Sequence, residues 1–186
     1  RVAREKQGQF FLVVEGAVPV EQDGRYCVIG EADHKELTLE GTLREMGPNA
    51  AAVLAVGTCA AYGGIPAAHG SVTGAMGVRD FFQSAGIQTP VVNIPGCPPH
   101  PDWIVGTLLV ALDFIKQKGL ADGLAEVLPL LDDDGRPTPF YGANTHENCP
   151  YLYLFDEGTM AEVITDKNGC RYDLGCKGPN SMCDSP

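Results

Sequence analysis

Three apolar runs mark out the first half of the chain. They cover residues 9–16 (QFFLVVEG), 51–57 (AAVLAVG) and 89–96 (TPVVNIPG), and each is almost continuously apolar instead of alternating with polar positions. Uninterrupted runs of this length are typical of strands that are buried on both faces of a parallel sheet. We therefore expect three parallel strands.

Two further segments carry the period of an amphipathic helix. Residues 74–86 place Val78, Phe81 and Phe82 on one stripe, and residues 101–119 run from a proline in the first turn to a glycine after the last lysine. Strands that alternate with helices predict an α/β fold with an open parallel sheet. We expect a short hairpin over residues 24–37.

The character of the chain changes in its second half. Beyond about residue 118 the proline, glycine and asparagine content rises, the periodicity fades, and four of the seven cysteines occur after residue 148. We expect an α/β domain over residues 1–134 and an irregular second module over residues 135–186. A loop-rich module with few core residues usually needs a staple such as a metal centre.

Charge and hydropathy exclude several classes of function. The formal net charge of −11 disfavours nucleic acid or an anionic membrane surface as a partner and favours a protein or a small molecule. No apolar run reaches the roughly 18 residues that a membrane span needs, so no transmembrane segment is expected. The sequence shows no signal peptide and no methionine at position 1, which indicates that an upstream segment has been removed.

Two cysteines follow the second and third apolar runs. Seven cysteines in a chain too large to need disulfide staples favour metal ligation. Cys59 and Cys97 each stand behind a glycine just past an expected strand, and the carboxyl ends of parallel strands meet at one edge of the sheet. Two convergent thiolates suit a soft metal or an iron-sulfur cluster, whereas the alternative is a pair of inert buried thiols. Glu15 ends the first strand at this edge, either as a hydrogen-bonding or proton-relay group or in an ordinary ion pair.

A second constellation lies in the irregular module. His146 and Cys149 form an H-x2-C pair, and Cys170 and Cys176 form a C-x5-C pair. Two short pairs of such ligands predict a single metal site. Their spacing fits a structural zinc of the Cys3His type, which is the commoner use of such a pattern, or a 4Fe-4S cluster with one imidazole ligand. Cys183 fits neither group and is expected to begin a third site.

Five blocks of the sequence carry a family resemblance. They are VVEGAVP, AVGTCAAYGGIPAA, VVNIPGCPPHPDWIVGTL, PFYGANTHENCPYL and GCRYDLGCKGP. In this order they resemble the small, electron-transferring subunit of nickel-iron hydrogenases, including the nickel-iron-selenium branch. The resemblance implies a flavodoxin-like N-terminal domain with a proximal 4Fe-4S cluster, followed by an irregular iron-sulfur module with a medial and a distal cluster.

The resemblance also implies a role for each candidate ligand. Two residues match ligands of the proximal cluster: Cys59 and Cys97. Four match the ligands of the distal 4Fe-4S cluster: His146, Cys149, Cys170 and Cys176. Cys183 matches the first ligand of a medial 3Fe-4S or 4Fe-4S cluster. At the second constellation the resemblance therefore favours iron and sulfide over zinc.

The expected partners follow from the same resemblance. The nickel-iron centre that splits hydrogen would lie in a separate large subunit, and electrons would leave near His146 to an external carrier such as a cytochrome or a ferredoxin. The family's location implies a periplasmic or membrane-associated protein. The N-terminal C-x-x-C that completes the proximal ligand set and the later cysteines of the medial set do not occur in this sequence, so we expect a chain that is incomplete at both ends.

Two other classes of protein remain as alternatives. One is a related subunit of a quinone reductase with a single cluster. The four ligands of the second constellation argue against it, because a one-cluster subunit would not need them. The other is a zinc-stapled binding module without a redox role, which predicts zinc and no acid-labile sulfide.

Overall fold

The structure, a computed structural model, describes residues 2–183 of the chain. The chain divides into two compact units, Arg1–Arg136 and Pro137–Pro186. Each unit is described by itself.

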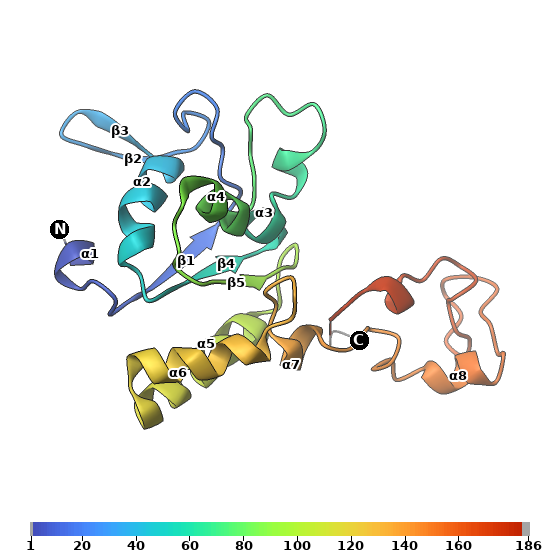
Figure 1. Cartoon of the computed structure of the whole chain (residues 1–186). Coiled ribbons are helices and arrows are strands. Elements are labelled where there is room, and N and C mark those ends of the chain that lie inside the picture. Colours follow the sequence, from blue (N-terminus) through green and yellow to red (C-terminus); the bar gives the residue numbers. More distant parts are fainter. Residues whose placement is uncertain (1, 184–186) are drawn as a thin grey trace. The chain divides into compact units, whose positions relative to one another are not determined.

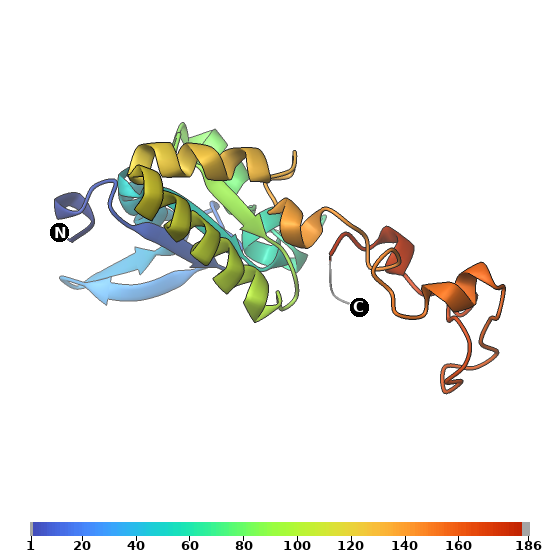
Figure 2. The same ribbon diagram turned by 90° about the horizontal axis from the view of Figure 1, so that it is seen from below.

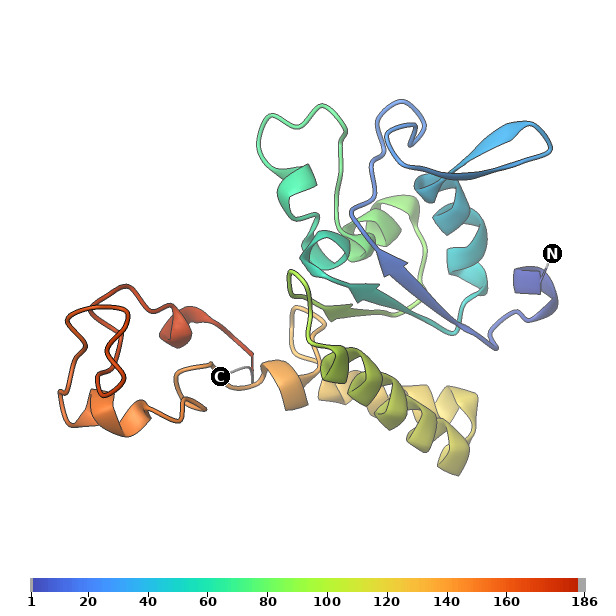
Figure 3. The same ribbon diagram turned by 180° about the vertical axis from the view of Figure 1, so that it is seen from behind.

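A three-stranded parallel sheet forms the centre of the first unit (Figure 3). Strand β1 (Phe11–Glu15) pairs with β4 (Ala52–Val56), and β4 pairs with β5 (Val91–Ile94), so the order is β1-β4-β5. The first four residues of β4 are all buried, as expected for the middle strand of a covered sheet. The three expected strands and the α/β fold class are confirmed, and each strand is shorter than its apolar run.

Helices cover both faces of this sheet (Figure 1). On one face lie α2 (Leu39–Met46) and α4 (Val78–Ala85), and on the other lie α5 (Pro101–Lys118) and α6 (Leu120–Val127), which run side by side (Figure 2). The main core lies between the sheet and the first pair of helices. Its buried side chains include Leu43, Val53, Val78, Phe81 and Phe82.

The two expected helices form for identifiable reasons. The stripe of α4 is buried, because Val78, Phe81 and Phe82 face the core. Helix α5 begins at Pro101, where the Nδ1 atom of His100 accepts a hydrogen bond of 3.2 Å from the N–H of Asp102. None of the helices within residues 2–183 combines the length and the apolar character needed to span a lipid bilayer.

The other elements of the first unit are short. Strands β2 (Val28–Ala32) and β3 (Lys35–Thr38) form the hairpin expected in this region. Cys27 precedes the hairpin and is partly buried against the core. The remaining elements are α1 (Val2–Glu5), α3 (Thr58–Tyr62) and the 3-10 helices η1 (Gly47–Asn49), η2 (Ile65–Ala67) and η3 (Leu128–Leu130).

The second unit contains little regular structure. Its elements are α7 (Thr138–Tyr141), α8 (Leu152–Asp156) and the 3-10 helix η4 (Gly178–Asn180). Backbone hydrogen bonds between distant segments give it shape: the N–H of Thr145 donates to Ser181 O (2.8 Å), and the N–H of Cys170 donates to Thr159 O (2.8 Å). The loops are therefore ordered by specific pairing and not by a large core.

Candidate functional site

The turns that follow β4 and β5 are bonded to each other. The N–H of Thr58 donates to Gly96 O (2.9 Å), and the N–H of Gly96 donates to Thr58 Oγ1 (3.1 Å). A third bond joins the N–H of Gly57 to Ile94 O (2.8 Å). Cys59 and Cys97 each stand one residue beyond this junction, so the structure brings together the two turns that carry them.

The two thiols are accessible at the surface of the first unit. Cys59 is partly buried in the first turn of α3, and Cys97 is exposed. The turn before Cys97 is tight, because a Cβ atom on Gly96 would lie 2.4 Å from Pro99 Cα. Only glycine permits this close approach of the backbone. Cys97 is therefore not a buried thiol, and Cys59 is only partly buried.

Glu15 lies at the same edge of the sheet. It is the last residue of β1, it pairs in register with Val56 at the end of β4, and its side chain is exposed. Its carboxylate thus stands on the strand next to the turn of Cys59.

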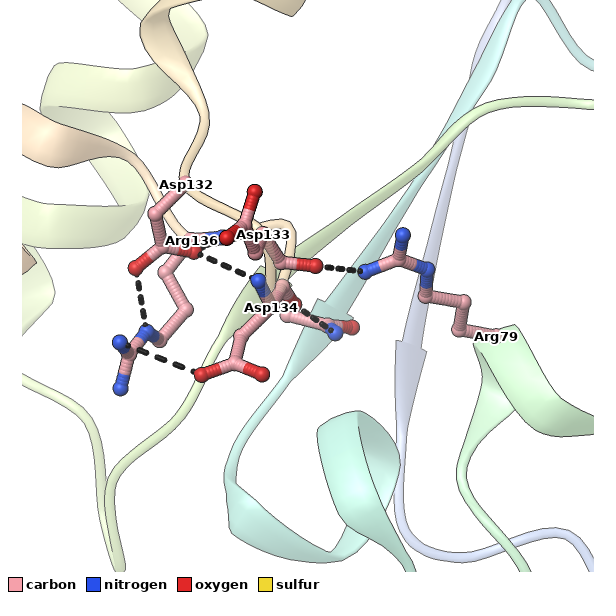
Figure 4. A network of polar contacts seen from close by, with 6 residues as sticks. Arg79, Asp132, Asp133, Asp134 and Arg136 are labelled. Atoms are coloured by element: carbon pink, nitrogen blue, oxygen red, sulfur yellow. Dashed lines mark hydrogen bonds and ion pairs between the residues drawn. The ribbon is translucent and has the colours of Figure 1, made fainter.

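A polar network lies beside β5 (Figure 4). Arg136 donates from Nε to Asp132 Oδ2 (2.7 Å) and forms an ion pair with Asp134 (Nη2 to Oδ2, 3.3 Å). Arg79, from α4, donates from Nη1 to the carbonyl oxygen of Asp133 (3.0 Å). The loop of residues 132–136 is therefore tied both to itself and to α4.

The same loop covers the free edge of β5. Asn93, which is buried, donates its N–H to Gly135 O (2.8 Å) and its Nδ2 to Asp134 O (2.8 Å). The charges of the loop also act on Tyr62, at the end of the helix that carries Cys59. Burial raises the pKa of Tyr62 to about 12; Arg136 acts to lower this pKa, and Asp134 acts to raise it.

A cavity in the second unit collects the second group of predicted ligands. His146, Cys149, Cys170 and Cys176 all line one cavity of about 130 Å³, which is roughly ten times the minimum that holds a water molecule. The other residues that line it are Thr145, Tyr151, Gly169, Arg171, Tyr172 and Gly178. The H-x2-C and C-x5-C pairs, more than twenty residues apart in the sequence, therefore meet around one space.

Local hydrogen bonds set the position of each ligand. The N–H of Cys149 donates to His146 O (3.2 Å), which closes the turn of the first pair. Cys170 is fixed on both sides, because its N–H donates to Thr159 O and its carbonyl accepts from Ala161 (2.8 Å). The sulfur of Cys176 accepts a hydrogen bond from the N–H of Gly178 (3.4 Å), a type of contact that stabilises a thiolate ligand.

The donor set of the cavity suits more than one metal centre. Within residues 2–183, no group of three His, Cys, Asp or Glu side chains lies close enough to share one metal ion. One imidazole and three thiols line the cavity, and these are ligands of a structural zinc of the Cys3His type or of an iron-sulfur cluster with one imidazole ligand.

Cys183 stands apart from this cavity. Its sulfur lies 3.3 Å from Thr145 Oγ1, and it is not among the residues that line the void. Thr145 is also the residue directly before His146. Cys183 thus lies next to a residue that lines the four-ligand cavity and is not itself among the lining residues.

Comparison with known proteins identifies the family. Residues 1–111 match the family described as NADH ubiquinone oxidoreductase, 20 Kd subunit, and residues 141–186 match the C-terminal family of the NiFe/NiFeSe hydrogenase small subunit. The second match decides between the quinone-reductase alternative and the hydrogenases. The chain belongs to the family of NiFe/NiFeSe hydrogenase small subunits. The recognition made from the five sequence blocks is confirmed.

Individual relatives agree with this hydrogenase assignment. The periplasmic [NiFeSe] hydrogenase small subunit of Desulfomicrobium baculatum is 50% identical over 98% of this chain, and the chain spans 58% of its length. The periplasmic [NiFe] hydrogenase small subunit 1 of Nitratidesulfovibrio vulgaris is 37% identical over 95% of the chain, which spans 51% of its length. A solved structure of the [NiFeSe] hydrogenase from Desulfovibrio vulgaris Hildenborough matches with a TM-score of 0.93 and 68% identity, over 98% of this chain and 65% of the other. The chain thus spans less than two thirds of the length of these relatives.

Several residues at these sites were not found from the sequence. Thr58 joins the two cysteine turns, Gly178 donates to a ligand sulfur, and Phe155 packs against the His146 ring. Thr58, next to Cys59, and Gly178, two residues after Cys176, lie close in sequence to a candidate ligand. Phe155 carries no such signal, because only the folded loops bring it to His146.

Proposed function

We propose that this chain is the electron-transferring part of a nickel-iron or nickel-iron-selenium hydrogenase. It would relay electrons between a nickel centre in a partner chain, where hydrogen is oxidised or protons are reduced, and an external redox carrier. An iron-sulfur cluster supplies one-electron oxidation and reduction when bound. The chain's own residues hold the clusters, exclude or admit water and set the distances between sites.

Each candidate ligand takes a place in this proposal. Two residues would hold a proximal 4Fe-4S cluster: Cys59 and Cys97. Four would hold a distal 4Fe-4S cluster: His146, Cys149, Cys170 and Cys176. Cys183 would hold one corner of a medial 3Fe-4S or 4Fe-4S cluster. Glu15 would act near the proximal site as a hydrogen-bonding or proton-relay group. The flavodoxin-like domain would cover residues 1–134 and the iron-sulfur module residues 135–186.

The cavity in the second unit carries the proposal. One imidazole and three thiols from two distant segments line a single cavity, and the match of residues 141–186 to the C-terminal family of the NiFe/NiFeSe hydrogenase small subunit favours an iron-sulfur cluster over zinc there. The bonded turns of Cys59 and Cys97 support the proposal independently, because two thiols are presented at the edge where open parallel sheets bind their ligands.

The partner would cover the edge that carries Cys59. Ile65, just after the Cys59 helix, is largely exposed, and Tyr62, at the end of that helix, is half-buried. Apolar and aromatic side chains at the surface are typical of the core of a subunit interface. We propose that a hydrogenase large subunit binds there. The external carrier would be a cytochrome or a ferredoxin, and the protein would act in the periplasm, where its relatives are named as periplasmic.

The first experiment measures iron, acid-labile sulfide and zinc per chain in the natively purified protein, together with nickel in any copurifying chain. We expect iron and sulfide in near-equal amounts. One zinc per chain without sulfide would exclude an electron relay and leave the cysteines as a structural staple.

Two cysteine variants make the experiment specific to the cavity. Cys149→Ser removes a cavity ligand and should lower the iron content by about four per chain. Cys27→Ser changes a cysteine that packs partly buried against the core and should leave the iron content unchanged. Equal iron in both variants would show that the cavity does not hold a cluster.

A further inference from the structure

Three aromatic rings beside the four-ligand cavity are linked by edge-to-face contacts. The ring of His146 meets Phe155 edge to face, with 4.7 Å between centroids and an interplanar angle of 88°. Phe155 in turn meets Tyr172 at 5.0 Å and 71°. Both distances fall in the range of roughly 4.5–7 Å that favourable edge-to-face pairs adopt. The imidazole therefore has a defined neighbour on one side.

A metal-binding imidazole works as a ligand only if the plane of its ring is restrained, and the restraint is commonly a hydrogen bond from its second ring nitrogen. At His146 the edge-to-face contact with Phe155 is a further restraint on that plane. A close-packed neighbour resists rotation of the ring, because the two rings would collide.

Phe155 is itself well anchored. It belongs to α8, whose Leu154 is buried, and the backbone after it is bonded back to the helix by Gly158 N–H to Phe155 O (3.0 Å) and Thr159 N–H to Leu154 O (2.8 Å). Thr159 then accepts from the N–H of Cys170 (2.8 Å). The ring that packs on one ligand thus stands on a segment bonded to another ligand.

Tyr172 closes the arrangement from the other side. It lies in the loop between Cys170 and Cys176 and lines the cavity. The ring contacts of His146, Phe155 and Tyr172 therefore join the H-x2-C segment to the C-x5-C segment, in addition to the backbone hydrogen bonds. A rotation of the His146 ring would require Phe155 to move, and Phe155 is backed by Tyr172.

We propose that Phe155 is a positioning residue for His146: its ring fixes the plane of the imidazole so that a ring nitrogen stays directed at the cluster. Tyr172 supports Phe155 in this position. This inference rests on the proposed function, because it requires a cluster in the cavity. It assigns to an apolar side chain the orienting role that a hydrogen bond plays at other histidine ligands.

The test compares three variants in the natively purified protein. Phe155→Leu removes the ring and keeps an apolar side chain, Phe155→Tyr keeps the ring, and Tyr153→Leu removes an exposed aromatic side chain from the same helix. The readouts are iron and sulfide per chain and the coupling of the reduced cluster to the imidazole nitrogen, measured by pulsed electron paramagnetic resonance.

We expect one well-defined nitrogen coupling in the unaltered protein, in Phe155→Tyr and in Tyr153→Leu. Phe155→Leu should replace it by a broad distribution with the iron content retained. Loss of iron from Phe155→Leu alone would also support the inference, because Phe155→Tyr would show that the ring is what is needed.

Other results would overturn it. A single unchanged coupling in Phe155→Leu would show that the ring does not position His146, and the same loss in Phe155→Leu and Phe155→Tyr would show that the edge contact is not the cause. Iron without any nitrogen coupling in the unaltered protein would remove His146 from the ligand set. Absence of iron and sulfide from the unaltered protein would instead overturn the proposed function itself.

Discussion

At the scale of single residues, Gly64 shows how closely the backbone wraps Cys59. A Cβ atom at this position would lie 2.6 Å from Cys59 Sγ and 3.1 Å from Cys59 Cα, and the backbone has a φ of +54°. Both the space and the dihedral angle therefore require glycine. This glycine, two residues after α3, keeps the thiol in place by leaving room for it.

We expect Gly64→Ala to displace Cys59 and to lower the iron bound between the two turns. Gly70→Ala is the matched control, since its φ is also positive (+85°) but a Cβ atom there would meet nothing within 4 Å. Each substitution should cost about 1 kcal/mol or more in unfolding free energy from the backbone alone. Urea unfolding and iron per chain separate the two effects, and equal iron content in both variants would contradict this role.

The ionisation of Tyr62 gives a second prediction for one residue. Its pKa is raised to about 12, first by burial, whereas an unfolded tyrosine titrates near 10. Between pH 10 and 12 the unfolded chain would lose this proton and the folded chain would keep it, so folding stability should fall through this window. In ultraviolet absorbance, Tyr62→Phe should reduce the late part of the tyrosine titration and weaken the fall in stability. A late phase of unchanged amplitude after the substitution would assign it to another tyrosine.

At the scale of elements, the loop of residues 132–136 acts as a cover for β5. The carboxylate of Asp132 accepts from the N–H of Asp134 (3.1 Å), the N–H of Arg136 (2.8 Å) and the Nε of Arg136 (2.7 Å). Burial acts to lower the pKa of Arg136, but the hydrogen bond and charge of Asp132 outweigh it and the pKa is raised. The loop keeps its shape through one carboxylate.

Asp132→Ala should therefore destabilise the first unit by about 2 kcal/mol, the scale of lost hydrogen bonds to a charged group. The neighbouring Asp133→Ala is the control, because Asp133 is exposed and contributes its carbonyl oxygen to Arg79, so its loss should stay within about 0.5 kcal/mol. Thermal or urea unfolding of both variants makes the comparison. Equal losses would show that the Asp132 carboxylate does not organise the loop.

The elements differed in how far the sequence predicted them. The three strands, α4 and α5 were found because long apolar runs or a clear stripe mark them. Helix α2 was missed because its buried apolar side chains are only Leu39 and Leu43, so no clear stripe marks it. Helix α6 was missed because Gly123 interrupts it, and that glycine is needed since a Cβ atom there would lie 2.6 Å from Ile115 of α5. Such a packing requirement is not visible in a local pattern.

At the scale of the whole molecule, the sequence located the candidate ligands better than it located what positions them. Cysteines and histidines in short pairs are visible as spacing, and the structure collects four of them around one cavity. Phe155 and Thr58 are harder to find, because an aromatic or hydroxyl side chain is common and its role depends on contacts across the fold. The positioning residues therefore emerge only from the folded chain.

The charge of the chain predicts how the rate of electron transfer to a redox carrier depends on salt. The formal net charge is −11, and residues 137–186 alone carry seven Asp or Glu and three Lys or Arg. We expect the reduction of a cationic acceptor to slow by about tenfold between low and high ionic strength, because salt screens the attraction. An anionic acceptor of similar potential should show the opposite trend. Stopped-flow rates at several salt concentrations measure both, and the same trend for both acceptors would exclude steering by charge.

The bonds between Thr58 and Gly96 also bear on the order in which the protein matures. Two thiols 38 positions apart in the sequence are brought together by the folded sheet and its bonded turns. The conformational entropy of these two turns is therefore lost on folding, before iron binds. The loops of the second unit have few buried residues of their own, and there the incoming cluster would contribute to folding. We expect hydrogen exchange of the metal-free chain to find the turns of Cys59 and Cys97 protected and the loops around His146 open. Cluster insertion would then follow folding at one site and accompany it at the other.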